Sequence, residues 1–240
     1  MVELESRFNF RDLNLYSHSY IYILKEIAML EGIEVITHSC IRIDKGKIIY
    51  FDPYNINQNY NDADIIFITH SHYDHYSEED IEKVKTDKTI YVAPRDVAEK
   101  ILEKGIDINK IVIANPNDTA IQNIKDIYFE VVPAYNVNKK FHPKENGWVG
   151  YILTIEGMRY YIAGDTDITD ENKKIKCDVA FVPVGGTYTM TCDEAAELVN
   201  IIKPKIAIPI HYGSVAGTKE DADIFIKLLD ADIIGKKIMK

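Results

Sequence analysis

Four potential metal ligands crowd into six residues of this chain, within a segment at 69–77 that reads Thr-His-Ser-His-Tyr-Asp-His-Tyr-Ser. They are His70, His72, Asp74 and His75, and the whole chain contains only seven histidines. Imidazole and carboxylate groups are ligands that suit Zn²⁺, Mn²⁺ and Fe²⁺. Exposed or simply hydrogen-bonded loop histidines are the structural alternative, but the density of the cluster favours a metal site.

The cluster follows an apolar, β-branched run at 65–68, which predicts a buried strand. On an extended chain His70 and His72 point to the same side, because side chains alternate with a period of two, so both could hold one ion. Asp74 and His75 come after a turn and suit a second ion nearby. The sequence therefore predicts two neighbouring ions rather than one.

Two more ligand-type residues end β-rich runs further along the chain. Asp165 follows the predicted strand at 158–163, and its carboxylate could bridge two cations or could be a solvated turn residue. His211 ends the predicted strand at 206–210. A lone histidine there is more often structural, but the main cluster favours its interpretation as a ligand.

Two other histidines are weaker candidates. His142 is the unassigned histidine of the central region, and a catalytic site of this type needs a third ligand on its first ion. The alternative is an exposed loop histidine beside Lys139 and Lys140. His38 follows the predicted strand at 33–37, where it either contacts substrate or supports the site, or is a buried, hydrogen-bonded residue.

Grouped strands with interspersed helices predict an α+β fold of two packed sheets covered by helices. Residues 1–31 are expected to be an N-terminal extension with a short helix near 16–30, and residues 32–240 a single domain. Strands are predicted at 33–37, 40–44, 47–51, 111–113, 127–132, 148–155, 158–163, 178–182, 206–210 and 232–238. Helices are predicted from 78, after the N-cap Ser77, and at 94–103, 191–203 and 219–229.

Charge and composition exclude several function classes. The net charge is −10 and no Lys/Arg-rich run stands out, so nucleic acid is not an expected partner. No apolar run approaches the roughly 20 residues that cross a bilayer, and no secretory signal is evident. The three cysteines are scattered, which predicts neither disulfides nor a thiolate zinc site. We expect a cytoplasmic protein with a small-molecule substrate and leave a homo-oligomer open.

These segments together resemble the metallo-β-lactamase superfamily. Its His-x-His-x-Asp-His signature is matched in full at 70–75, and Gly-Asp-Thr at 164–166 and the late His211 follow in the family's order. The segments 36–39 (Ile-Thr-His-Ser) and 52–54 (Asp-Pro-Tyr) are more like one branch. That branch includes ascorbate-6-phosphate lactonase and N-acylphosphatidylethanolamine phospholipase D.

The resemblance covers about residues 32–240 and implies an αββα sandwich with two divalent ions, zinc first and manganese or iron as alternatives, at one edge of the sheets. It implies that the first ion is held by His70, His72 and His142, the second by Asp74, His75 and His211, and that Asp165 bridges them. Much of the branch has a histidine where this chain has Ala134-Tyr135-Asn136. Either His142 reaches in from a longer loop, or the first ion has only two histidines.

The residues and the resemblance predict a dinuclear metal-dependent hydrolase. A metal-bridging hydroxide, oriented by Asp74, would attack an ester, lactone or phosphoester of a small metabolite. His38 and Tyr188 are the predicted substrate contacts, although the segment 183–190 around Tyr188 could equally be a tight strand-to-helix connection. The alternative function is a nuclease similar to the tRNA 3′-processing endonuclease, which would need an electropositive arm.

Overall fold

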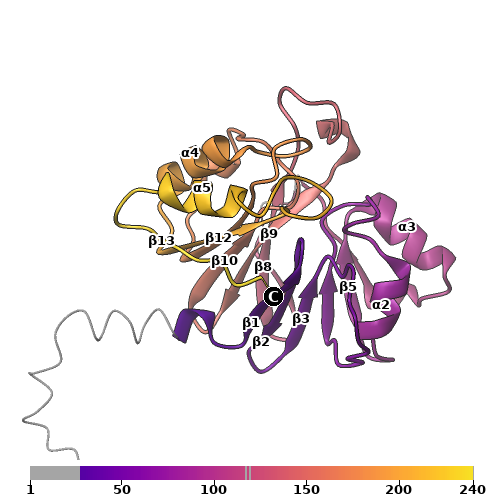
Figure 1. Cartoon of the computed structure of the whole chain (residues 1–240). Helices are drawn as coiled ribbons and strands as arrows, with labels where there is room; N and C mark the ends of the chain where they lie inside the picture. Colours follow the sequence, from indigo (N-terminus) through magenta and orange to yellow (C-terminus); the bar gives the residue numbers. More distant parts are fainter. Residues whose placement is uncertain (1–27, 117, 119, 240) are drawn as a thin grey trace, which may run out of the picture. The chain divides into compact units, whose positions relative to one another are not determined.

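The computed structural model describes residues 28–116, 118 and 120–239 (Figure 1). The chain divides into two units, Met1–Glu31 and Gly32–Lys240, and every element below belongs to the second unit. The predicted extension over residues 1–31, with its helix near 16–30, lies almost entirely outside the described residues and stays a prediction. Within the described ranges, no helix is long and apolar enough to cross a membrane.

Six strands from the first half of the chain form one sheet in chain order. The first three pair antiparallel, and β3 through β6 pair parallel. The strands are β1 (Ile33–Thr37), β2 (Cys40–Asp44), β3 (Ile48–Phe51), β4 (Ile65–Phe67), β5 (Ile90–Ala93) and β6 (Ile111–Ile113). The predicted strands of this half are confirmed to within one residue, whereas β5 was not predicted.

The second sheet has seven strands in the order β13-β12-β11-β10-β9-β8-β7. Strands β10 through β13 pair parallel, and β7 through β10 pair antiparallel. The strands are β7 (Gln122–Ile124), β8 (Ile127–Pro133), β9 (Val149–Ile155), β10 (Met158–Ile162), β11 (Val179–Pro183), β12 (Ile206–Ile210) and β13 (Ile234–Gly235). The prediction of a strand over 232–238 is wrong in length, because this edge segment pairs with β12 over two residues only.

Two pairs of helices lie on different sheets (Figure 1). They are α2 (Glu78–Val84), α3 (Arg95–Glu103), α4 (Cys192–Ile202) and α5 (Asp221–Lys227), with short 3₁₀ turns at Ile108–Lys110, Lys144–Asn146 and Asn172–Lys174. Ser77 accepts the Asp80 amide at the start of α2, and Thr191 and Glu194 form a reciprocal capping box on α4, both as predicted. Helix α5 is shorter than the predicted 219–229.

The domain has four layers: a pair of helices, two sheets and a second pair of helices. Apolar side chains fill the three spaces between these layers. Aromatic side chains fill the space between the sheets, where Phe67 of β4 lies 5.2 Å from Phe129 of β8 and 5.0 Å from Tyr151 of β9, measured between ring centroids. The α2 and α3 side chains pack on the outer face of the first sheet, and those of α4 and α5 on the outer face of the second. The fold is the αββα sandwich of the sequence prediction.

Three strands end in a residue with left-handed backbone geometry. These are His38 after β1, Asp52 after β3 and His211 after β12, with φ of +48°, +43° and +55°. Such a conformation costs a residue with a side chain about 1–2 kcal/mol, and it persists where the surroundings impose it. All three side chains lie in one cluster, described next, so this strain is concentrated at the site.

Candidate metal centre

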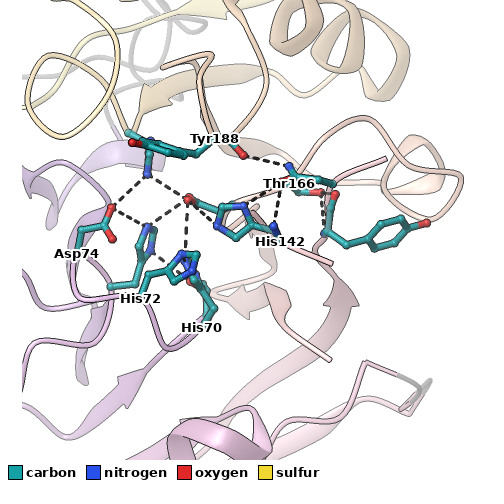
Figure 2. Close-up of polar contacts among 12 residues, drawn as sticks. His70, His72, Asp74, His142, Thr166 and Tyr188 are labelled. Atoms are coloured by element: carbon teal, nitrogen blue, oxygen red, sulfur yellow. Dashed lines mark hydrogen bonds and ion pairs between the residues drawn. The ribbon is translucent and has the colours of Figure 1, made fainter. Parts of the chain in front are cut away.

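All seven predicted metal-ligating side chains lie together where strand ends of the two sheets converge. His70, His72 and Asp74 come from the first half of the chain, and His142 reaches them from the second half (Figure 2). The ligand atoms of the described residues form three overlapping groups, each within 4.8 Å: His70, His72 and His142 in the first, Asp74, His75, His211 and also His38 in the second, and His70, His75 and Asp165 in the third. The first two groups contain the residues that the resemblance implies for each ion, and the third takes one histidine from each of them.

Asp165 joins the two groups. Its Oδ2 atom lies 3.2 Å from His142 Nε2 of the first group and 3.1 Å from His211 Nε2 of the second. Its other oxygen, Oδ1, lies 3.3 Å from His75 Nε2. Gly164, with φ of +64°, lets the preceding backbone pack closely, since a Cβ there would lie 2.9 Å from the Val149 carbonyl oxygen. Asp165 is therefore in the position of a bridging ligand.

The cluster leaves buried polar atoms without hydrogen-bond partners. Among the described residues, these include the Nε2 atoms of His75, His142 and His211 and the Oδ1 atom of Asp165. Unpaired buried polar atoms are rare and call for an explanation such as a bound ion. Their convergence, and the nitrogen and oxygen chemistry of the set, fit divalent cations.

Hydrogen bonds on the opposite side of three rings fix which nitrogen faces the cluster. His75 Nδ1 lies 2.7 Å from Asp52 Oδ2, and the Thr69 hydroxyl, which donates to the same carboxylate oxygen, lies 3.0 Å from His70 Nδ1. Because Asp52 can only accept, His75 donates through Nδ1, and Nε2 is left for the centre. Histidines that bind metals are commonly held in this way.

Asn136 holds the third ring. Its Oδ1 atom accepts the His142 backbone N–H at 3.0 Å and lies 3.2 Å from His142 Nδ1. This amide oxygen can only accept, so the proton is on Nδ1 and Nε2 faces Asp165. The loop that carries His142 is therefore pinned to the site at its backbone and at its ring.

Burial and the two carboxylates govern the protonation of the cluster. Burial holds the pKa of His70 well below its ordinary value and lowers the pKa of His38 to about 4. Burial also opposes ionisation of Asp165, yet the nearby His211 and His75 keep the pKa of its carboxyl well below the usual range. The Asp165 carboxylate is therefore ionised, and His38 and His70 are neutral. Burial disfavours the charged forms of His75 and His211, yet Asp165 raises the pKa of His75 well above its ordinary value and that of His211 to about 9, so these two rings lose a proton when they bind a cation.

The sequence left open whether His142 or a group near Tyr135 completes the first ligand group. His142 is 1% exposed and belongs to the first ligand group. The hydroxyl of Tyr135 instead donates to Glu171 at 2.8 Å and lies 3.3 Å from Lys144 Nζ. The loop after β8 carries the histidine into the cluster, and Tyr135 points to a different set of residues.

We expect a His142→Ala variant to bind metal at least about 100-fold more weakly, because a candidate ligand of the first group is removed, whereas loss of a residue that only orients a ligand costs about 10- to 100-fold. A Tyr135→Phe variant, which only loses the hydroxyl bonds to Glu171 and Lys144, serves as the matched control and should keep the parent metal count. Metal per chain, measured by inductively coupled plasma mass spectrometry at limiting free metal, checks both. Equal loss in the two variants would contradict the assignment of His142.

A family model for the β-lactamase superfamily domain matches residues 32–211, three quarters of the chain and all of the ligand cluster. The chain belongs to the metallo-β-lactamase superfamily. The match begins at the first residue of the second structural unit and includes every strand of the two sheets except β13. It confirms the resemblance and the fold class that the motifs predicted.

Relatives within the superfamily are metal-dependent hydrolases by name. A UPF0173 metal-dependent hydrolase of Methanosphaera stadtmanae is 29% identical over 85% of this chain and 93% of its own length. One from Lysinibacillus sphaericus is 30% identical over 80% of this chain and 89% of its own. A crystal structure of a candidate metal-dependent hydrolase from Parabacteroides distasonis is 33% identical, with a TM-score of 0.70 over 87% of this chain and 93% of that one. This superfamily member thus falls among metal-dependent hydrolases.

A pocket of about 220 Å³ opens onto the centre of this superfamily member. It is lined by His72, Tyr73, Asp74, Phe141, His142, Asp165, Tyr188 and Val215. Tyr188, a predicted substrate contact, lies on this wall, whereas His38 is fully buried behind Asp74 and does not line the pocket. His38 thus supports the site from behind.

The segment 183–190 connects β11 to α4, which is the tight strand-to-helix connection that the sequence offered as an alternative. Gly185 lies directly against His211, since a Cβ at Gly185 would be 2.3 Å from the His211 carbonyl oxygen. The glycine therefore serves close packing beside a ligand. Tyr188, three residues later, is the part of the segment that reaches the pocket.

The sequence-based search missed the residues that orient the ligands. Asp52 had a detectable signal, since it follows the strand 48–51 as the other candidates follow theirs. Asn136 and Trp148 gave no such signal. The ring centroid of Trp148 lies 5.0 Å from that of His70 and 4.8 Å from that of His72. The Trp148 indole N–H is donated to Asp96. Such contacts depend on the tertiary fold rather than on spacing.

Proposed function

We propose that this chain is a dinuclear hydrolase that cleaves an ester, lactone or phosphoester of a small molecule. The observation that carries the proposal is the place of Asp165, whose Oδ2 atom lies within 3.2 Å of a histidine from each ligand group. Two cations held by these groups would be adjacent and would share the carboxylate. Zinc is the first choice, and manganese and iron suit the same ligands.

Cations held there supply an acidified water as nucleophile and polarise the bond that is cleaved. The residues of the chain do the rest. Asp74 lines the pocket and belongs to the second ligand group, so it can take the proton of the attacking water while it orients that water. Asp165 and the histidines would hold the ions next to each other.

His38 and Ser214 hold Asp74 in place. His38 Nε2 lies 3.1 Å from Asp74 Oδ2, and His38 Nδ1 lies 3.1 Å from Ser214 Oγ. Because the carboxylate can only accept, His38 donates through Nε2 and accepts the Ser214 hydroxyl at Nδ1. One oxygen of Asp74 is thereby fixed, and the carboxylate enters the reaction already oriented.

Metal analysis and turnover together test the proposal. We expect purified protein to hold up to two divalent ions per chain and to hydrolyse members of a panel of p-nitrophenyl esters, lactones and bis-p-nitrophenyl phosphate. Removing the metal with a chelator should abolish turnover, and adding Zn²⁺ or Mn²⁺ should restore it. Protein that takes up no metal, or that turns over the panel equally well after chelation, would refute the proposal.

The nuclease alternative shares the ligand set and is tested by the same panel. It requires a positive surface to bind the phosphate backbone, and the chain carries a net charge of −10. Turnover of the phosphodiester alone, together with cleavage of RNA, would favour the nuclease over the small-molecule hydrolase.

A further inference from the structure

We propose, on the basis of the hydrolase function above, that the pocket receives the apolar group of an uncharged ester or lactone and disfavours a phosphorylated substrate. The juxtaposition that carries this is a set of apolar and aromatic side chains beside the ligand cluster, in a pocket whose described lining has no lysine or arginine. The sequence alone did not distinguish carboxylic esters and lactones from phosphoesters as the substrate class.

The pocket is lined by two chemically different kinds of residue. Some are ligands of the centre, including Asp74 and Asp165, and the apolar wall consists of Tyr73, Phe141, Val215 and Tyr188. A small substrate whose apolar group contacts this wall would have its reactive bond close to the ligands. The pocket therefore offers apolar contact and chemistry within one small space.

Two aromatic side chains of the apolar wall are exposed to solvent beside the ligand cluster. Tyr73 is 65% exposed and Phe141 is 38% exposed, and the Phe141 and Tyr188 rings meet edge to face at 4.8 Å. Covering these surfaces with an apolar group is favourable in proportion to the area removed from water. The exposed rings therefore indicate an apolar occupant.

The pocket lacks the groups that bind phosphate. Among the described residues, its lining contains no lysine or arginine. Lys139, on the same loop as Phe141, is held at 2.6 Å from Asp167 and 3.5 Å from Glu194, so its charge is balanced. A phosphorylated substrate would have only the metal ions to neutralise it, without the arginine or lysine contacts that usually recognise phosphate.

The helix that follows Tyr188 also disfavours an anion. Helix α4 starts with Asp193 and Glu194 in its first turn, and Glu194 accepts the Thr191 backbone N–H at 2.8 Å in the capping box. The backbone N–H groups of Thr191 and Glu194 are thus occupied, and two carboxylates repel negative charge at this helix start.

The volume limits the size of the apolar group. At about 220 Å³ the pocket exceeds the roughly 150 Å³ apolar cavity that admits benzene. A phenyl ring or a short acyl chain fits, whereas a long lipid chain would extend into solvent. The structure thus assigns a small aryl or short-chain acyl ester, or a lactone of similar size.

Binding measured without turnover tests the inference separately from the hydrolase proposal. We would add acetanilide, a neutral and slowly hydrolysed aryl amide, and inorganic phosphate to zinc-loaded protein, and follow acetanilide by saturation-transfer NMR. We expect acetanilide to bind through its ring, and phosphate at up to tenfold higher concentration not to displace it. Turnover of p-nitrophenyl butyrate should exceed that of bis-p-nitrophenyl phosphate at least tenfold.

Three variants test whether the apolar side chains of the pocket cause the expected preference for an uncharged substrate. Phe141→Ser should raise the KM for p-nitrophenyl butyrate about tenfold and leave kcat within twofold, because apolar contact is lost while the ligands stay. Val215→Lys should shift the preference toward bis-p-nitrophenyl phosphate by adding a cation to the lining. Tyr128→Ser, at a 53% exposed tyrosine on β8 outside this pocket, is the matched control and should change neither value.

The outcomes separate the two proposals. Protein that binds phosphate but not acetanilide, and hydrolyses only the phosphodiester, would overturn the apolar pocket and leave the hydrolase intact. Protein that binds acetanilide at the Phe141 wall but hydrolyses nothing would support the pocket and count against the hydrolase. Equal KM changes in Phe141→Ser and Tyr128→Ser would overturn the assignment of the wall.

Discussion

An Asp74→Ala variant is expected to fold like the parent protein and to lose about a thousandfold in kcat, the size typical for removal of a group that transfers a proton. The Asp74 side chain lies at the end of a loop, where its Oδ2 atom is 3.1 Å from His38 Nε2 and 3.4 Å from His211 Nε2. None of the three strand-packing layers depends on it. The loss should appear in kcat more than in KM, because the carboxylate acts on the attacking water.

An exposed aspartate gives the matched control for this experiment. Asp87→Ala removes a carboxylate from the surface loop before β5 and should keep full turnover. Thermal unfolding and far-ultraviolet circular dichroism establish that both variants fold, and metal analysis shows how many ions Asp74→Ala retains. A folded Asp74→Ala protein with undiminished turnover would refute the role of Asp74.

Much of the candidate site could be predicted because several of its residues follow closely on the end of a strand. An apolar run that ends in histidine or aspartate is a local pattern, and packing two sheets brings several such strand ends to one place. His70 and His72 after β4 and His211 after β12 are found in this way. The sequence could therefore indicate which residues meet without giving the orientation of any of them.

The parts that the sequence did not predict depend on long-range contacts. Strand β5 (Ile90–Ala93) is short, and the pairing that stabilises it comes from β4 and β6, which lie far from it along the chain. The orientation of His142 depends on Asn136, which binds it across a loop, and no periodicity predicts such a contact. Turn and loop geometry of this kind follows from the whole fold.

The second large effect is expected for Asp52→Ala, which should lower the free energy of unfolding by about 3 kcal/mol or more. Asp52 is 1% exposed and accepts three hydrogen bonds: the Thr69 N–H at 2.8 Å, the Thr69 hydroxyl at 2.7 Å and His75 Nδ1 at 2.7 Å. Each donor left unsatisfied and buried costs about 1–3 kcal/mol. Urea unfolding of metal-free protein measures the loss.

The same variant should bind metal about 10- to 100-fold more weakly, because His75 loses the carboxylate that fixes its tautomer. Asp80→Ala separates the two effects. Asp80 is also a buried aspartate, which accepts the Asn55 and Ile56 amides at 2.8 and 2.9 Å on the α2 side of the fold, so its removal should destabilise the chain comparably and leave metal affinity unchanged. If both variants lose metal affinity equally at matched folded fractions, Asp52 acts only through stability. If Asp52→Ala alone loses it, the carboxylate positions a metal ligand, and turnover should fall in proportion to the ion lost.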